Sequence, residues 1–104
     1  MNIIDTKGKI TFGNDFPKLA IGDKLFEVND LKETADKIDK VLRDDKVTDK
    51  DRQVLLIALG KDQMKEIDAM QLKASGFVNL VKYVMATIQG VSFEEFEEMA
   101  NGQN

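Results

Sequence analysis

The spacing of apolar residues changes once along this chain, near residue 29. Before that point, short apolar runs alternate with turn-forming residues, which is typical of β-hairpins. After it, apolar residues recur every three to four positions, the period of an amphipathic helix. The pattern predicts an α+β fold in one domain spanning residues 1–104. Residues 1–28 are expected to form short β-hairpins packed on a cluster of four to five helices in residues 29–100, followed by a frayed tail, 101–104.

Two hairpins are expected in the β-rich part. The first has arms at residues 2–6 and 9–12 around Lys7-Gly8. The second has arms at residues 18–21 and 24–28 around Gly22-Asp23. A Gly-Asp pair between two short apolar runs predicts a two-residue turn, because glycine supplies the positive φ that such a turn needs.

Helix boundaries are expected at capping residues and glycines. The first helix is expected to begin at Asp30, with Glu33 completing a capping box, and to end near Arg43. The expected caps of the later helices are Thr48, Ser75 and Ser92, and the expected stops are Gly60, about Leu72, and Gly90. Residues 54–59 are apolar without interruption, so the second helix is predicted to be the buried centre of the cluster.

The acidic stretch GVSFEEFEEM, residues 90–99, invites a metal or catalytic interpretation. Its spacing favours a docking helix instead. Ser92 and Glu95 stand three apart, as in a capping box, and Val91 is placed to pack on Phe96 as a hydrophobic staple. The remaining glutamates are expected to face solvent, where nothing raises a carboxyl pKa for acid–base work.

Composition limits the chemistry further. The chain has neither cysteine nor histidine, which removes disulfides, thiolate and imidazole catalysis, and most zinc sites. The net charge is −4, with basic residues interleaved among acidic ones, so nucleic acid is not an expected partner. No apolar run is long enough to span a membrane, and no signal peptide is visible. We expect a cytoplasmic, non-enzymatic protein without cofactor or metal.

The fourth helix carries more apolar surface than a surface helix needs. Its apolar side chains cover an arc of roughly 220°, against about 100° for a typical surface helix. Its polar or small stripe consists of Asn79, Lys82, Ala86 and Gln89. Either this helix is sandwiched within the domain, or another chain covers part of it, which predicts a protein partner or a homo-oligomer. The residues expected to bind a partner are Phe77, Val81, Tyr83, Val84, Met85, Ile88, Phe93 and Phe96.

Other sites fit the sequence less well. Residues 44–51 are acidic, but no register supplies the ligands of a calcium-binding EF-hand loop. The helices on either side of Gly60 allow an alternative function, a small DNA-binding regulator, although acidic residues mix with the basic ones on the third helix. A hydrolase built on carboxylates is a third alternative.

Residues 55–67, LLIALGKDQMKEI, and residues 80–90, LVKYVMATIQG, together with the acidic end, resemble the small tail assembly chaperones of long-tailed bacteriophages. The resemblance covers residues 50–100 and includes a leucine-glycine-lysine helix break at Leu59-Gly60-Lys61. It implies a mainly helical, acidic protein without catalysis, acting in the host cell cytoplasm. Such proteins coat or escort the tape-measure protein and help tail-tube subunits assemble around it. The resemblance places the interaction residues on the helical part, above all on the fourth helix.

Overall fold

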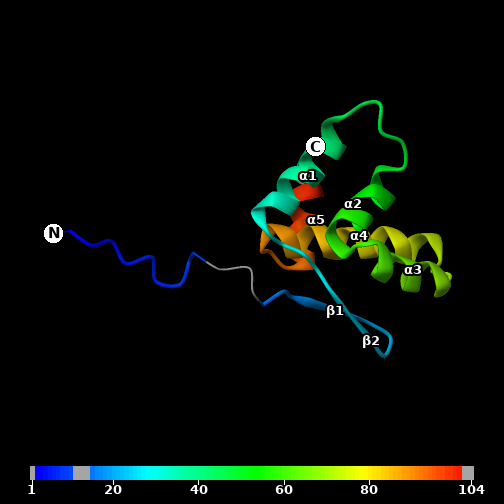
Figure 1. The fold of residues 1–104 in the computed structure, drawn as a ribbon, viewed down its shortest axis with the longest axis horizontal. Helices are drawn as coiled ribbons and strands as arrows, with labels where there is room; N and C mark the ends of the chain where they lie inside the picture. Colours follow the sequence, from blue (N-terminus) through cyan, green and yellow to red (C-terminus); the bar gives the residue numbers. More distant parts are fainter. Residues whose placement is uncertain (1, 11–14, 102–104) are drawn as a thin grey trace.

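The computed structural model describes residues 2–10 and 15–101 of the chain. Within them it confirms the α+β class, because a two-stranded antiparallel hairpin precedes five helices (Figure 1). The strands are β1 (Lys18–Ile21) and β2 (Lys24–Glu27). The helices are α1 (Lys32–Arg43), α2 (Lys50–Leu59), α3 (Lys61–Ala69), α4 (Ala74–Gln89) and α5 (Phe93–Asn101). Residues 102–104 of the expected tail lie outside the described residues.

The second predicted hairpin forms as expected. Gly22 has φ 62°, so it supplies the left-handed conformation of the tight turn. Leu19 pairs with Phe26, and both side chains turn toward the helices, where Phe26 is almost completely buried. The hairpin therefore has one face in the core, as strand alternation requires.

The first predicted hairpin forms only its turn. Lys7 and Gly8 both have positive φ, 52° and 76°, and the Lys9 amide donates to the Thr6 carbonyl at 3.0 Å, which defines a type I′ turn. Residues 2–10 nevertheless contain no strand, and residues 11 and 12 of the expected arm lie outside the described residues. A hairpin that buries no apolar face is marginal in water. The side chains of Ile3 and Ile4 are in fact 83% and 89% exposed.

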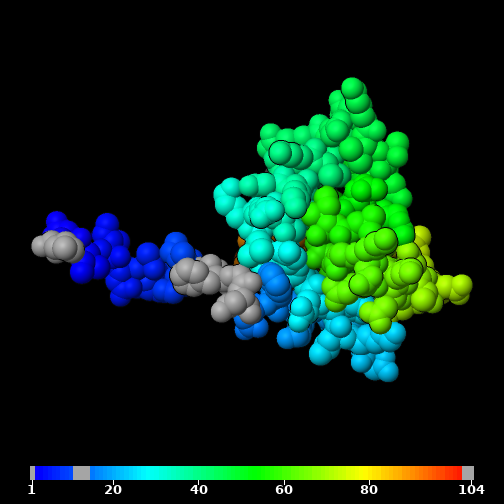
Figure 2. Space-filling view, viewed as in Figure 1, coloured from blue at the N-terminus to red at the C-terminus, as the bar shows by residue number. Residues whose placement is uncertain are grey.

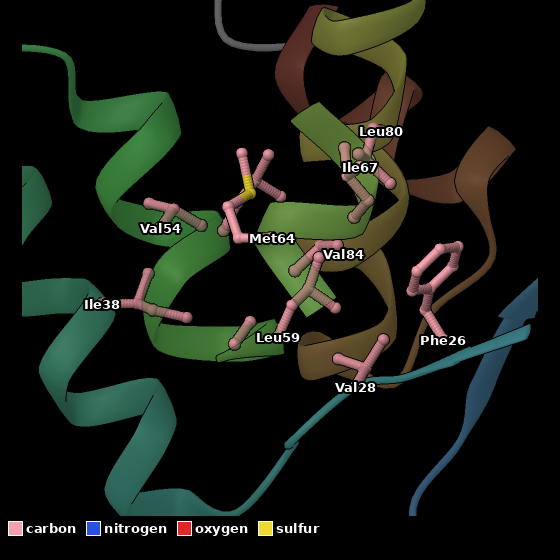
Figure 3. Close-up of a cluster of buried hydrophobic side chains, with 11 residues drawn as sticks. Phe26, Val28, Ile38, Val54, Leu59, Met64, Ile67, Leu80 and Val84 are labelled. Carbon is pink, nitrogen blue, oxygen red and sulfur yellow. The ribbon is translucent and has the colours of Figure 1, made fainter. Parts of the chain in front are cut away.

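Helix α2 is the centre of the core, as the sequence predicts. Its Val54, Leu55, Ala58 and Leu59 are buried. Figure 3 shows side chains from several other elements converging on it. These side chains are Phe26, Val28, Ile38, Met64, Ile67, Leu80 and Val84.

Several expected helix boundaries are wrong. Helix α1 has no capping box at Asp30; instead the Asn29 side-chain oxygen accepts hydrogen bonds from the Leu31 amide, at 3.1 Å, and the Thr34 hydroxyl, at 2.7 Å. Neither Thr48 nor Ser75 caps its helix. The Asp49 and Lys73 carbonyls accept the first helical hydrogen bonds of α2 and α4, so the N-cap positions are Asp49, one residue after Thr48, and Lys73, two residues before Ser75.

The end of α3 also differs from the prediction. The helix ends at Ala69 rather than near Leu72. Gln71 adopts a left-handed conformation, with φ 55°, and so turns the chain out of the helix. Spacing alone could not reveal this, because Met70 and Leu72 still pack against the core from outside the helix.

A glutamine attaches the hairpin to the helices. The Glu27 amide donates to Gln63 Oε1 at 2.9 Å, and Gln63 Nε2 donates to the Glu27 carbonyl at 2.8 Å. Gln63 Nε2 also donates to the Leu59 carbonyl at 2.7 Å, near the end of α2. The side chain of Gln63 thus pairs with β2 as a neighbouring strand would.

We expect Gln63→Ala to lower the free energy of unfolding by roughly 1–3 kcal/mol, because it removes hydrogen bonds that join β2 to the helices. Chemical denaturation measures the change. Gln53→Ala is the matched control, because Gln53 is a half-buried glutamine whose side chain makes no hydrogen bond within the described part of the chain. Equal losses in the two variants would contradict this role of Gln63.

Two leucines test the position of the core. Leu55 is completely buried, whereas Leu25 is 66% exposed. We expect Leu55→Ala to cost about 2–5 kcal/mol of unfolding free energy, because it leaves a cavity in the packed centre. Leu25→Ala should cost less than about 1 kcal/mol. Similar denaturation midpoints for the two variants would show that α2 is not the centre.

Candidate functional site

Helix α4 is sandwiched between the core and α5, the first of the two arrangements that its wide apolar arc allows. Leu80 and Val84 belong to the buried core cluster, which also includes residues of α2. Ala86 is also buried, although it belongs to the predicted polar or small stripe. Packing within the chain therefore covers most of the apolar arc.

Lys82 of the polar stripe of α4 contacts α5, and this corrects the expectation that the glutamates of α5 all face solvent. Lys82 Nζ forms an ion pair with Glu97 Oε2 at 3.1 Å, and both side chains are more than half buried. Glu97 thus joins the two helices. Glu94 and Glu98 are exposed, as predicted.

The connection between α4 and α5 is set by local hydrogen bonds. Gly90, with φ 73°, ends α4; its amide donates to the Thr87 carbonyl at 3.1 Å, and the Val91 amide donates to the Ala86 carbonyl at 3.0 Å. These two bonds form a Schellman motif. The predicted capping box follows at once and is confirmed: the Glu95 amide donates to Ser92 Oγ at 3.0 Å, and the Ser92 amide donates to Glu95 Oε1 at 3.2 Å.

This connection brings two aromatic rings together. Tyr83 of α4 and Phe93 of α5 stack with their ring centroids 4.2 Å apart and their planes at 29°. Phe93 is half-buried, whereas Tyr83 remains 47% exposed. The pair forms a partly exposed aromatic surface at the edge of the sandwich.

The structure separates the eight predicted partner-binding residues into three groups. Val84 is completely buried and offers no surface in this conformation. Tyr83 is well exposed. The others are half-buried, and those on α4 pack against the core: Phe77, Val81, Met85, Ile88, Phe93 and Phe96. Val78 and Met99, which are not among the predicted residues, are about half exposed.

A hollow that the sequence did not indicate lies between β1 and α4, with a volume of about 240 Å³. It is lined by Lys18, Leu19, Ala20, Ile21, Leu80 and Tyr83. It joins one edge of the hairpin to the exposed ring of the aromatic pair. No local pattern could predict it, because its walls come from segments about sixty residues apart, a separation evident from Ala20 and Leu80.

Charged residues of α3 are partly neutralised by their neighbours. Arg52 of α2 binds Asp68 through two hydrogen bonds, with Nη1 and Oδ1 2.9 Å apart. These bonds lower the pKa of the Asp68 carboxyl below its ordinary value of 3.8 and raise the pKa of Arg52. Lys24 Nζ lies 3.9 Å from Glu66 Oε1 on the same helix. Two of the three acidic residues of α3, Glu66 and Asp68, therefore have basic partners.

Two kinds of feature are absent from the described residues. Within residues 2–10 and 15–101, no three acidic side chains lie together in a way that could hold a metal ion. None of the helices described there has both the length and the apolar character needed to cross a bilayer.

No protein-family model, curated protein or solved structure matches this chain significantly.

We expect Ser92→Ala to destabilise α5 by about 1 kcal/mol, because the Glu95 amide loses its cap. Tyr83 is the only tyrosine and the chain has no tryptophan, so intrinsic fluorescence during denaturation reports on α5 docking beside Phe93. Ser75→Ala is the matched control, because Ser75 lies in the first turn of α4 without capping it. A larger loss for Ser75→Ala would contradict the assignment.

The Arg52–Asp68 pair predicts a pH dependence. Because the folded-state pKa of Asp68 is lowered, the pair stabilises the fold fully above about pH 3.8 and loses that effect as the pH falls through the lower, folded-state value. We expect Asp68→Asn to flatten the decline of unfolding free energy over this acidic range. Arg52→Gln should flatten it equally, since Asp68 then lacks its partner. Slopes equal to that of the wild type would contradict the prediction.

Proposed function

We propose that this chain is a non-enzymatic protein-binding protein whose partner docks on the exposed side of α4 and α5. The observation that carries the proposal is the stacked pair of Tyr83 and Phe93 beside the hollow along β1. An aromatic ring that is held in place yet half exposed loses little conformational freedom when a partner covers it. Tyrosine is for this reason enriched among the residues that dominate protein interfaces.

The neighbourhood of the aromatic pair suits an apolar segment with polar flanks. Leu80 supplies a nearly buried apolar wall beside Tyr83, and Lys18 supplies a charge at the end of β1. Val78 adds exposed apolar surface elsewhere on α4. A mixed surface of this kind resembles the apolar centre and polar rim of a transient interface.

The side chains of the acidic helix favour binding over catalysis. A general acid needs a desolvated carboxyl group that is free to exchange its proton. Glu97 is more than half buried, but it is held by Lys82. Glu95 is engaged by the Ser92 amide. Both carboxylates therefore have structural partners, and we assign them no chemical step.

We propose further that the partner is a tape-measure or tail-tube protein of a long-tailed bacteriophage. This part rests on the resemblance of residues 50–100 to tail assembly chaperones, whose proposed place of action is the host cytoplasm. A chaperone of this class must hold an apolar segment reversibly until assembly. A small aromatic surface serves that purpose better than a large obligate interface.

Co-expression tests the proposal. A tagged chain is produced with each protein encoded beside it, and recovery of a tape-measure or tail-tube protein is measured. We expect Tyr83→Ser to weaken the complex at least about tenfold, whereas Tyr83→Phe keeps the ring and binds nearly normally. Leu42→Ser is the control, because it removes an equally exposed apolar residue from α1. Unchanged binding by Tyr83→Ser would overturn the assigned surface.

A further inference from the structure

The hairpin has one occupied edge and one open edge. The Val28 amide donates to the Pro17 carbonyl at 2.9 Å, so the alternation of an antiparallel ladder directs the backbone groups of Lys18 and Ala20 away from β2. On the other side, Gln63 pairs with Glu27 of β2. No hydrogen bond within the described part of the chain satisfies the outward groups of Lys18 and Ala20. Strand β1 is therefore free to accept another strand.

The hollow follows this open edge. All four residues of β1 line it, and Leu80 and Tyr83 of α4 form its opposite side. A groove between an edge strand and a helix is the geometry in which proteins bind an extended segment by adding it to a sheet. In such a groove, main-chain hydrogen bonds fix the segment, and alternate side chains enter the apolar side.

The chain itself contains a segment that fits. Residues 2–6, Asn-Ile-Ile-Asp-Thr, are rich in β-branched residues, which favour strands. Ile3 and Ile4 are almost fully exposed, and Figure 2 shows residues 2–10 standing clear of the body of the molecule. Asp5 supplies a charge opposite to that of Lys18 on the edge. The type I′ turn at Lys7-Gly8 has the twist of a hairpin, so the segment is already shaped for a sheet.

The direction in which residues 2–10 leave the rest of the chain indicates which molecule fills the groove along β1. In Figure 1 residues 2–10 lead away from the helices and from β1 of their own chain. The exposed side chains of Ile3 and Ile4 are therefore free to pack against a neighbouring molecule. We propose that residues 2–6 of one copy add as a strand to the open edge of β1 in a second copy. Reciprocal exchange closes a symmetric dimer and leaves no open edge at β1. The dimer needs no heterologous partner, but it fills the hollow beside Tyr83 to which we assign partner binding, so a partner and a second copy would compete for it.

Light scattering after size-exclusion chromatography tests the dimer. At tens of micromolar, we expect the wild-type chain to show twice its 11.7 kDa mass. The double variant Ile3→Asp with Ile4→Asp should run as a folded monomer, since neither residue contributes to the core. Ala20→Pro should also run as a monomer, because it removes the outward donor without touching the β1–β2 ladder. Ile10→Asp is the matched control: it changes an exposed isoleucine outside residues 2–6 and should stay dimeric. A monomeric wild type, or a dimeric double variant, would overturn the proposal.

Cysteine cross-linking separates exchange between copies from folding back within one chain. The natural sequence has no cysteine, so each introduced thiol is unique. Ile4→Cys and Ala20→Cys chains, made with tags of different mass and mixed in equal amounts, should form a disulfide-linked heterodimer under mild oxidation. A single chain that carries both Ile4→Cys and Ala20→Cys, oxidised at low concentration, should not close an internal disulfide. An internal disulfide without the heterodimer would show that the segment occupies its own groove and would refute the exchange. Partner binding through Tyr83 is measured separately on the aspartate variants, so failure of one proposal leaves the other distinguishable.

Discussion

The requirement to cover the apolar second half of α2 organises this protein: Val54, Leu55, Ala58 and Leu59 are buried there. Six apolar residues in succession, Val54 to Leu59, leave that half of the helix no polar face to turn toward water. The other elements are arranged so as to cover it: Ile38 from α1, Met64 and Ile67 from α3, Leu80 and Val84 from α4, and Phe26 and Val28 from the hairpin and its exit. Each of these elements is amphipathic and brings one apolar stripe to the centre. Short segments that could not bury their apolar faces alone thus bury them together by packing around one helix.

The break at Gly60 has consequences beyond the turn itself. It ends α2 and starts α3 without a loop, which places Gln63 one turn beyond the end of α2 and beside β2. From there the glutamine side chain satisfies the Glu27 amide and carbonyl while still bonding to Leu59. A second bond, from the Asn29 amide to the Ala58 carbonyl at 2.9 Å, holds the chain where it enters α1. Because these contacts occupy the β2 side, β1 becomes the open edge, and it lies across a hollow from α4. The strand-accepting groove is therefore a by-product of how the hairpin is anchored.

Helices α4 and α5 show how packing can reverse a surface predicted from sequence. Lys82 and Ala86 fall on the stripe expected to face water, yet Ala86 is buried and Lys82 pairs with Glu97 of α5. The apolar arc meanwhile turns partly toward the core and partly toward β1. What remains exposed is the ring of Tyr83, held against Phe93. The docking of α5 on α4 therefore also creates the aromatic surface to which we assign partner binding.

The sequence by itself determined the elements whose signals are local. The Gly22 turn, the central run of α2, the glycine stops at Gly60 and Gly90, and the capping box of Ser92 and Glu95 each depend on residues within a few positions of one another, so spacing was enough to predict them. The cap of α1, the early end of α3 and the fate of the first hairpin were not predictable in this way. The Asn29 side chain bonds to Leu31 and Thr34 at the start of α1 while its amide bonds to Ala58 of α2, and residues 2–6 bury no apolar face. Only the tertiary structure decided which part of α4 stays exposed and where the groove lies, because both depend on contacts between segments distant in the chain, and such contacts leave no periodic signal in the sequence.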